Sequence, residues 1–188
     1  DPDIILVGET RTKETAQIAI NASLTWHLVF TTLHTNSVLD SLSRLMNMGI
    51  EPYLLTPALQ LIIGQRLVRK VCPHCWERQD ATPEEDTEIR KKLIELQKIN
   101  PEAWKNYQGK IFKGKGCEHC NHSGYKGRIA IIEILEINDQ IREKLMNEKQ
   151  GENLLPLAKS FSFISMQEDG ILKVIEGITD LKEVHRVL

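Results

Sequence analysis

The stretch Asp3–Arg11 reads DIILVGETR, with an apolar run that ends at a glycine. The apolar residues follow one another without the polar alternation of a half-exposed strand. Such a run is typical of a β-strand buried on both faces, as in a parallel sheet covered by helices. Glu9 stands directly after this strand, at the end where a parallel sheet carries its ligand chemistry.

A helix and a second strand follow in the pattern of a β-α-β unit. Thr12 can cap a helix with apolar residues on one side. The segment His27–Leu33 (HLVFTTL) is rich in β-branched and aromatic residues, which predicts a second buried strand. Because parallel strands end at the same edge of a sheet, Glu9 and His34 are expected at that edge.

The rest of the chain continues to alternate strands and helices, which predicts an α/β fold with a mainly parallel sheet. Further helices are expected over 37–48, ending at Gly49, over 84–97, and from about 138 onward. Another helix is expected to be capped by Thr56 and to have Pro57 at its first position. Further strands are expected over 67–71 and 128–135. Ser165 and Glu168 have the spacing of a capping box, and Thr179 is expected to cap the final helix.

An acid at the end of a buried strand is the general form of a Walker B element in nucleotide hydrolases. A carboxylate at this place can hold a metal-bound water or polarise the water that attacks a γ-phosphate. The spacing alone leaves a second interpretation open, in which Glu9 only solvates the strand end or caps a helix.

The segment His27–Asn36 (HLVFTTLHTN) has a histidine at each end of the second strand and hydroxyl groups near the second histidine. An imidazole at a strand end can hydrogen-bond a phosphate oxygen. On these residues alone the simpler interpretation is favoured, in which His34 caps the sheet and Asn36 caps the following helix.

Four cysteines, Cys72, Cys75, Cys117 and Cys120, form the pairs CPHC and CEHC, with 41 residues between the pairs. Two thiolates separated by two residues can reach one cation from a tight turn, and two such turns complete a tetrahedral sulfur shell. Because four cysteine ligands leave no open position, the predicted zinc site is structural rather than catalytic.

Two alternatives to this zinc site stay open. The tetrapeptide CPHC is also the active-site sequence of thiol oxidases of the thioredoxin class, in which the first cysteine is an acidic thiol. A second pair of identical spacing, with no cysteine left over, speaks against that redox interpretation. His74, His119 and His122 lie close enough to replace a cysteine as ligand, although solvated loop histidines are the simpler interpretation.

Composition and charge exclude several classes of protein. The 188 residues are 41% hydrophobic and 27% charged, and 24 basic against 26 acidic residues give a net charge of −2. This balance argues against a generally basic nucleic-acid-binding surface. No apolar run approaches the roughly 18–20 residues that cross a bilayer, and the first residues do not resemble a secretory signal. Because Asp1 stands directly before a strand, the chain is expected to be a fragment.

Several ordered motifs, taken together, point to one family. They are DPDIILVGETR at 1–11, TLHTN at 32–36, MGIEP at 48–52, QRLVR at 65–69, CPHC at 72–75, CNHSGYKGR at 120–128, DG at 169–170 and GITDLKEV at 177–184. The chain resembles the secretion ATPase superfamily, and within it the type II secretion ATPases (general secretory pathway protein E) and the type IV pilus assembly ATPases. The resemblance covers nearly the whole sequence except the variable stretch 76–116.

The resemblance implies roles for the residues already singled out. Glu9 is implied to be the Walker B acid near the attacking water. His27 and His34 are implied to form the family's histidine box, with His34 closest to the γ-phosphate, and Arg11 is implied to orient neighbouring acids. The four cysteines correspond to the family's tetracysteine zinc subdomain, and ATP and Mg²⁺ are the implied ligands of the intact protein.

Three residues depart from the family's pattern. Trp26 stands where glycine usually precedes the histidine, Thr12 replaces an aspartate, and Thr10 replaces an aliphatic residue. The P-loop pattern Gly-x-x-x-x-Gly-Lys-[Ser/Thr], which binds phosphate, does not occur in the 188 residues. In this family the P-loop lies upstream of the Walker B strand. The chain is therefore expected to be the C-terminal portion of a motor subunit that by itself neither binds ATP tightly nor hydrolyses it.

The resemblance thus predicts an α/β fold: the C-terminal part of a RecA-like P-loop NTPase core without its P-loop half (1–71), a tetracysteine zinc subdomain (72–127), and a strand followed by a helical C-terminal subdomain (128–188). In the intact protein, a hexameric ring is expected to couple ATP hydrolysis to the extrusion of pilin or pseudopilin subunits. The implied partners are further copies of the chain and an inner-membrane platform protein, with the motor in the cytoplasm and peripherally bound to the inner membrane.

A protein of a different class would also satisfy the cysteine motif, namely a zinc-stabilised binding module without ATPase activity, such as a nucleic-acid or protein adaptor. Its basic residues would form one face around the metal. The candidates are Arg66, Arg69, Lys70, Lys110, Lys113, Lys115, Lys126 and Arg128. Solvated surface lysines are the simpler interpretation, and nucleic acid is an unexpected partner.

Overall fold

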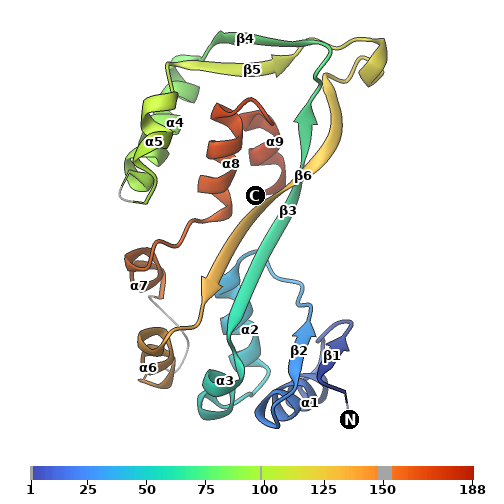
Figure 1. Ribbon diagram of the computed structural model, residues 1–188, viewed down its shortest axis with the longest axis vertical. Coiled ribbons are helices and arrows are strands. Elements are labelled where there is room, and N and C mark those ends of the chain that lie inside the picture. Colours follow the sequence, from blue (N-terminus) through green and yellow to red (C-terminus); the bar gives the residue numbers. More distant parts are fainter. Residues whose placement is uncertain (1, 98, 148–153) are drawn as a thin grey trace. The chain divides into compact units, whose positions relative to one another are not determined.

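A computed structural model gives the fold of residues 2–97, 99–147 and 154–188 (Figure 1). Strands and helices alternate along these residues, as expected for an α/β protein. None of the helices in these three ranges is long and apolar enough to cross a membrane.

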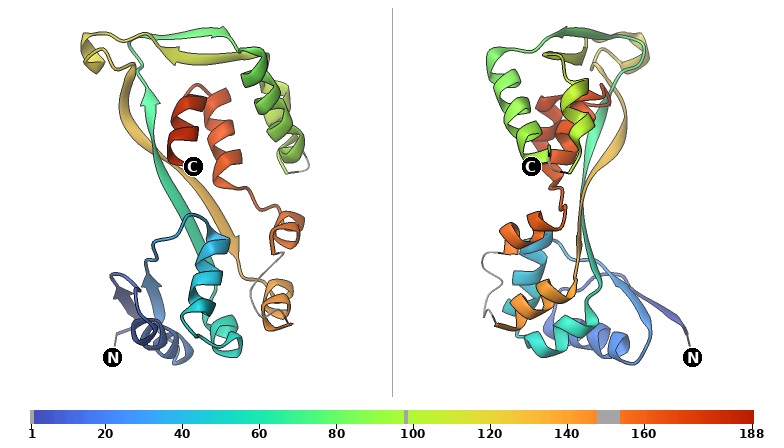
Figure 2. Two further views of the ribbon diagram at one scale, coloured as in Figure 1. Left: turned by 180° about the vertical axis from the view of Figure 1, so that it is seen from behind. Right: turned by 60° about the vertical axis from the view of Figure 1, so that its left-hand side comes forward.

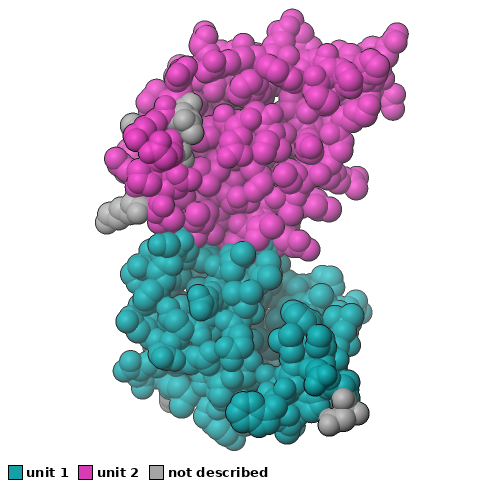
Figure 3. All heavy atoms as spheres, viewed as in Figure 1, with its two compact units in different colours: residues 1–64, 134–163 teal, residues 65–133, 164–188 magenta. Residues whose placement is uncertain are grey.

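The chain divides into two compact units (Figure 3). The first unit combines Asp1–Gly64 with Ile134–Phe163, and the second combines Gln65–Glu133 with Ile164–Leu188. Each unit therefore takes residues from two separate segments of the chain. The expected division into three consecutive subdomains stays a prediction.

The first unit contains a parallel pair of strands, β1 (Ile4–Val7) and β2 (Leu28–Thr31), which helix α1 (Lys13–Leu24) connects (Figure 1). Each residue of β1 has a partner in β2. The predicted β-α-β unit is confirmed, and it places the ends of both strands at one edge. The predicted burial of these strands was wrong for this chain, because their residues are exposed or half-buried.

Local sequence signals set the ends of the first two helices. Thr12 caps α1, because its hydroxyl accepts a hydrogen bond from the backbone of the first turn at 3.4 Å. Helix α2 (Val38–Asn47) is capped in the same way by Ser37, at 3.1 Å, and not by Asn36. Gly49 follows α2 with a φ of 79°, a left-handed conformation that glycine adopts at low cost and that ends the helix as predicted.

The start expected for the next helix was wrong. Helix α3 (Pro52–Ala58) has Glu51 at its N-cap, and Pro57 lies inside it rather than at its first position. Pro52 explains the difference, because proline is pre-organised for the first helical position, where its missing N–H costs nothing.

Two further helices of the first unit, α6 (Asp139–Asn147) and α7 (Leu154–Ser160), complete its apolar core. The residues buried between these helices and α2 include Val38, Leu42, Leu135, Ile137, Ile141, Leu145, Leu154, Ala158 and Phe163. A neighbouring cluster packs α1 against α2 and α3, and it comprises Ala16, Ile20, Leu45, Ile50 and Leu55. Residues of α2 belong to both clusters, so packing fixes the position of α2. The segment between β2 and α2 is therefore attached to a fixed helix.

Two more strand pairs complete the described sheets. Strands β3 (Leu61–Val71) and β6 (Tyr125–Glu136) pair with one another, and each contributes residues to both units. Strands β4 (Trp76–Asp80) and β5 (Lys110–Gly114) pair antiparallel in the second unit. Among the described strands, the expectation of a mainly parallel sheet is therefore met only by the pair β1 and β2. The described strands form three two-stranded sheets rather than one, and β4 and β5 pair antiparallel.

The helices of the second unit are α4 (Pro83–Leu96), α5 (Pro101–Asn106), the 3₁₀ turn η1 (Glu118–Cys120), α8 (Met166–Ile175) and α9 (Leu181–Val187). Helices α8 and α9 lie side by side, and α4 packs against α8 (Figure 2). Their shared core consists of Ile89, Leu93, Leu96, Tyr107, Ile111, Ile171, Val174, Leu181 and Val184.

The capping signals of the last two helices gave one correct and one wrong prediction. Ser165 and Glu168 form the predicted capping box at the start of α8. Helix α9 is capped by Asp180, whose Oδ1 accepts a hydrogen bond from Glu183 N at 3.0 Å, and not by Thr179. The Thr179 hydroxyl instead donates to the carbonyl oxygen of Arg69 at 2.8 Å, which ties the loop before α9 to β3.

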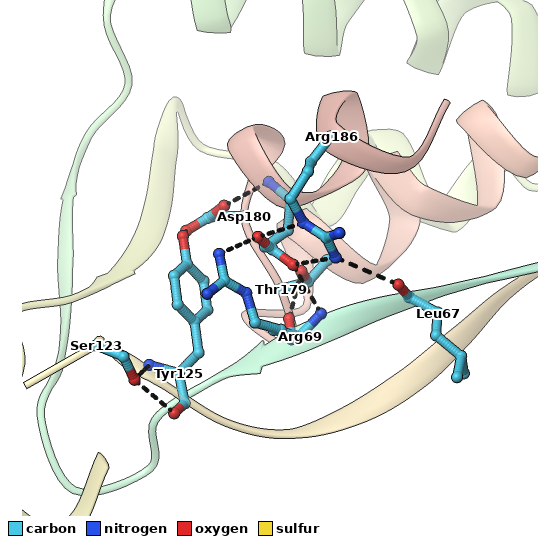
Figure 4. Close-up of polar contacts among 8 residues, drawn as sticks. Leu67, Arg69, Ser123, Tyr125, Thr179, Asp180 and Arg186 are labelled. Carbon is cyan, nitrogen blue, oxygen red and sulfur yellow. Dashed lines mark hydrogen bonds and ion pairs between the residues drawn. The ribbon is translucent and has the colours of Figure 1, made fainter. Parts of the chain in front are cut away.

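An ionic network around the buried carboxylate of Glu183 fastens the start of α9 to β3 and β6 (Figure 4). Glu183 is fully buried, pairs with the guanidinium of Arg69, and accepts hydrogen bonds from Arg69 N and Arg186 Nε, both at 3.0 Å. The Arg69 guanidinium lies 4.2 Å from the ring centroid of Tyr125, whose hydroxyl donates to Asp180 Oδ2 at 2.6 Å. The bonds from Arg69 to Glu183 and from Tyr125 to Asp180 therefore depend on the docking of α9, whereas the Arg186–Glu183 pair lies within the helix.

Candidate active-site cluster and metal centre

Three of the predicted site residues meet beyond the ends of β1 and β2. Glu9 Oε1 lies 2.6 Å from Arg11 Nε and 2.7 Å from His34 Nε2. The Glu9 side chain is 24% exposed, whereas those of Arg11 and His34 are largely exposed. The carboxylate is thus held by two cationic or hydrogen-bonding groups in a position that solvent still reaches.

Threonine hydroxyl groups fix the backbone around this cluster. Thr10 N donates to Thr32 O at 2.9 Å, so the pairing of the two segments continues beyond the strands. The hydroxyls of Thr10 and Thr31 lie 2.8 Å apart, and the Thr32 hydroxyl donates to Gly8 O at 2.7 Å. Thr10 is buried, and its hydroxyl has this partner, which explains why a polar residue is tolerated at a position expected to be aliphatic.

Electrostatics keep Glu9 ionised. The hydrogen bond with the Arg11 guanidinium holds the pKa of the Glu9 carboxyl below its usual range; burial opposes this shift, and the charges of Arg11, His34 and Arg44 add to it. The same bond raises the pKa of Arg11. At neutral pH the cluster therefore presents a carboxylate that can orient a water molecule and accept its proton.

His27 does not join this cluster. Its Nδ1 lies 3.1 Å from both Ala22 O and Thr25 Oγ1, at the turn between α1 and β2. A strand rises about 3.3 Å per residue, so residues at opposite ends of β2 are far apart. The implied pairing of His27 with His34 in one histidine box therefore has no contact in the structure, and a role for His27 stays a prediction.

Arg44 is a member of the cluster that the sequence did not identify. It lies on α2, and its Nη1 donates to the backbone carbonyl oxygen of His34 at 3.0 Å. The available signal was a basic residue in the last turn of the helix after the second strand. That signal is usually explained by the helix dipole alone.

The four predicted metal ligands lie together in the second unit. Sγ atoms of Cys72 and Cys117 are 3.9 Å apart, those of Cys75 and Cys120 are 3.8 Å apart, and those of Cys117 and Cys120 are 3.8 Å apart. All four Sγ atoms lie within 4.8 Å of one another. A tetrahedral zinc ion with Zn–S bonds of about 2.3 Å requires S–S distances of about 3.8 Å, which these pairs match.

Backbone N–H groups around the cysteines point at sulfur, as expected around thiolates. Gly116 N lies 3.3 Å from Cys75 Sγ, and Cys120 Sγ accepts from Cys117 N at 3.2 Å and from Gly124 N at 3.3 Å. Burial opposes the ionisation of Cys120, but these two N–H groups and the thiols of the neighbouring cysteines outweigh it and lower its pKa to about 6, whereas burial raises the pKa of Cys75. The donor set and its hydrogen bonds therefore fit a four-thiolate zinc site.

His74 and His119, which lie next to the cysteines in the sequence, do not belong to the group of potential metal ligands. The rings of His74 and His119 stack with their centroids 4.2 Å apart. Among the residues that the structure describes, the cysteines alone form a group of three or more potential ligand side chains close enough to share one ion. Replacement of a cysteine ligand by a histidine therefore has no support in the geometry.

Curated relatives match the chain over its full length. Type II secretion system ATPase E of Vibrio cholerae is 42% identical over 187 residues, which are 100% of this chain and 35% of the relative. Type IV pilus assembly ATPase PilB of Thermus thermophilus is 43% identical over 185 residues, which are 98% of this chain and 20% of the relative. The chain therefore spans about a third or less of the length of these relatives.

Solved structures share the fold at lower sequence identity. The crystal structure of the pilus retraction motor PilT with bound ADP aligns with 100% of this chain and 40% of its own, at a TM-score of 0.64 and 23% identity. The ATPase DotB of Legionella pneumophila aligns with 99% of this chain and 38% of its own, at a TM-score of 0.62 and 21% identity. This likeness supports an α/β fold of the kind found in part of an ATPase.

A family model described as "Type II/IV secretion system protein" matches residues 1–186. The motifs that suggested this family from the sequence are spread over the same range. Because the match covers nearly every residue, the chain belongs to the type II/IV secretion system protein family.

Proposed function

We propose that this chain is part of a secretion or pilus-assembly motor ATPase and supplies the carboxylate that activates water for ATP hydrolysis. The observation that carries this proposal is the 2.7 Å distance between Glu9 Oε1 and His34 Nε2 beyond the ends of two parallel strands. Ligands of α/β enzymes bind at that end of the strands. The names of the relatives, secretion and pilus-assembly ATPases, support the same function.

Each residue of the cluster has a distinct proposed role. Glu9 orients the attacking water and accepts its proton, for which an ionised carboxylate is required. Arg11 fixes the orientation of the Glu9 carboxylate, and His34 bonds a γ-phosphate oxygen. When bound, Mg²⁺ supplies charge neutralisation on the phosphates. His27 is proposed to hold the start of β2 instead, because it contacts the turn after α1.

One face of the β1–β2 pair is apolar and exposed, which supports the proposal that a further part of the full-length protein packs against it. Ile4 pairs with Leu28, and Leu6 pairs with Phe30, so the four side chains share one face. They are between 52% and 77% exposed. Strands of a parallel sheet are normally covered on both faces. We propose that a segment preceding this chain in the full-length protein covers this face and provides the P-loop, so that the chain alone is inactive.

The assembly proposed for the full-length protein follows from the family. A hexameric ring of motor subunits would act on pilin or pseudopilin subunits at the cytoplasmic face of the inner membrane, docked on a polytopic platform protein. The four-cysteine site would hold a structural Zn²⁺ that fixes the ends of β3 and β6, because Cys72 follows β3 directly and its N–H donates to Gly124 O at 2.9 Å, just before β6.

The proposal is tested by restoring the missing part. The chain is joined to the residues that precede the matched region in the Vibrio cholerae relative, and ATP hydrolysis is measured by phosphate release. The joined protein should hydrolyse ATP, and Glu9→Gln should lower kcat at least a hundredfold, because proton transfer by a positioned carboxylate contributes a factor of that order. The 188-residue chain alone should release no phosphate.

Glu51→Gln is the matched control. Glu51 is an exposed glutamate of the same unit that stands at the N-cap of α3 without a side-chain hydrogen bond. The Glu51→Gln variant of the joined protein should therefore have the same kcat as the unmodified joined protein. A folded joined protein that does not hydrolyse ATP, or one in which Glu9→Gln and Glu51→Gln are equally active, would contradict the proposal.

A further inference from the structure

The position of His34 depends on the segment that leads from β2 to α2. Side-chain hydrogen bonds tie this segment to α2. The hydroxyls of Thr35 and Ser41 lie 2.7 Å apart, the Ser41 hydroxyl donates to Ser37 O at 3.2 Å, and Ser37 caps the helix. These bonds anchor the segment after His34, and a side chain of α2 also reaches the backbone of His34 itself.

That side chain is Arg44. Its Nη1 donates to His34 O at 3.0 Å, the backbone carbonyl of the same residue whose Nε2 contacts Glu9. Arg44 is followed by Leu45, which is buried in the core, so the helix turn that carries the guanidinium is fixed. A charged donor bonded to a backbone carbonyl restricts the direction of the peptide that carries it.

We propose that Arg44 is a positioning residue, which holds the backbone of His34 so that the imidazole Nε2 stays against Glu9. This inference deepens the proposed function and rests on it for its catalytic meaning. Three groups with positive charge or the capacity for it face the Glu9 carboxylate: Arg11 from the segment after β1, His34 from the segment after β2, and Arg44 from α2. Arg44 acts on the carboxylate chiefly through His34.

A simpler role for Arg44 is the stabilisation of the C-terminal end of α2 by positive charge. The two roles differ in what Arg44→Lys retains. Lysine keeps the charge near the helix end but lacks the planar guanidinium and its directional N–H groups. If Arg44 serves only the helix end, Arg44→Lys behaves like the unmodified chain; if it positions His34, Arg44→Lys behaves like Arg44→Gln.

The test measures Glu9 directly in the 188-residue chain. The chain carries ¹³C-labelled glutamate, and NMR follows the carboxyl signal of Glu9 through a pH titration, with Glu9→Gln assigning the signal. Arg44→Gln and Arg44→Lys should both raise the pKa of Glu9, because a displaced His34 no longer favours its ionised form. In the His34→Ala background, the further rise caused by Arg44→Gln should become clearly smaller.

Arg142→Gln is the matched control. Arg142 also lies on a helix of the first unit and also donates to backbone carbonyls, at Thr56 O and at Leu59 O (3.2 Å), so its loss reports on general loosening of the unit. It should leave the Glu9 titration unchanged. If Arg44→Gln does not fold, the comparison rests on Arg44→Lys in the two backgrounds.

Three results would overturn the inference: an unchanged Glu9 titration in folded Arg44 variants, an equal shift with and without His34, or an equal shift in Arg142→Gln. None of these results requires nucleotide. A failure of this inference can therefore be distinguished from a failure of the proposed function. The NMR titration tests the inference, and phosphate release by the joined protein tests the proposed function.

Discussion

Glu9 and His34 come from segments after different strands, yet Glu9 Oε1 and His34 Nε2 lie 2.7 Å apart. The register of β1 and β2 and the hydrogen bond from Thr10 N to Thr32 O together set this distance. The contact is therefore a consequence of parallel pairing. Any change that shifts the register of these strands would separate the carboxylate from the imidazole.

Removal of a cysteine ligand should remove the metal. Native mass spectrometry of the chain should show about one zinc ion per molecule, and Cys72→Ser should abolish it, because a three-thiolate remnant binds zinc far more weakly. The second unit of Cys72→Ser should also unfold at lower urea concentration. His122→Ala is the control and should retain one zinc ion. A folded, metal-free chain with four titratable thiols would defeat this assignment.

Acid should weaken the docking of α9 through Glu183. Burial opposes the ionisation of Glu183, but the bonds from Arg69 and Arg186 outweigh it and lower its pKa to about 2, from an ordinary value of 4.5. A lowered pKa stabilises the fold at pH values above about 4.5, and this contribution is lost as the pH falls toward 2. The full contribution is about 3 kcal/mol.

The measurement compares urea unfolding of the unmodified chain and Glu183→Gln from pH 7 to pH 3. The difference in unfolding free energy should be largest at pH 7 and should shrink as the pH falls below 4.5. Glu84→Gln, a change of an exposed acid on α4, serves as control and should show little pH-dependent difference. A difference that stays constant, or grows toward low pH, would show that Glu183 is not the titrating group.

Trp26 should be a site where glycine stabilises the chain. Its φ of 73° lies in the left-handed region, and its side chain is 96% exposed, so the indole gains little from packing. A residue with a Cβ in this region costs about 1–2 kcal/mol, part of which glycine loses again in chain entropy. Trp26→Gly should therefore raise the unfolding free energy by about 1 kcal/mol. Trp26→Ala keeps the Cβ and should give no such gain; equal gains would exclude backbone strain as the cause.

Gly114 should tolerate no side chain. A Cβ at this position would lie 2.0 Å from the carbonyl oxygen of Gly124, in the loop that bonds Cys120 Sγ. Gly114→Ala should therefore lower both the stability of the second unit and its zinc content. Gly8→Ala is the control, because no atom lies within 4 Å of a Cβ at that position. Thermal unfolding and zinc analysis of both variants measure these effects. Full zinc content in Gly114→Ala would contradict the close packing of Gly114 against Gly124.

The sequence predicted those features that depend on neighbouring residues in the chain. The strand–helix–strand order, the cap at Thr12 and the capping box of Ser165 and Glu168 follow from local patterns, and the structure confirms them. The grouping of the four cysteines followed from spacing, since two turns of the same kind can share one ion.

Features that depend on tertiary contacts were not predicted. Thr179 and Asp180 are both good caps, and Asp180 caps α9 because Thr179 is engaged with the backbone of Arg69. Pro52 and Pro57 both allow a helix start, and packing decides between them. Arg44 could not be placed in the cluster, because its contact with His34 depends on how α2 folds back on the strand end.

The central claim is that Glu9, acting on the attacking water, and His34, acting on a γ-phosphate oxygen, work together in one reaction. A double-mutant cycle tests this claim most directly. The value of kcat is measured for the joined protein and for Glu9→Gln, His34→Ala and the double variant. Residues that act as a unit show strongly non-additive losses. The double variant should therefore be about as slow as the slower single variant. If the two losses multiply, Glu9 and His34 contribute independently and the claim is wrong.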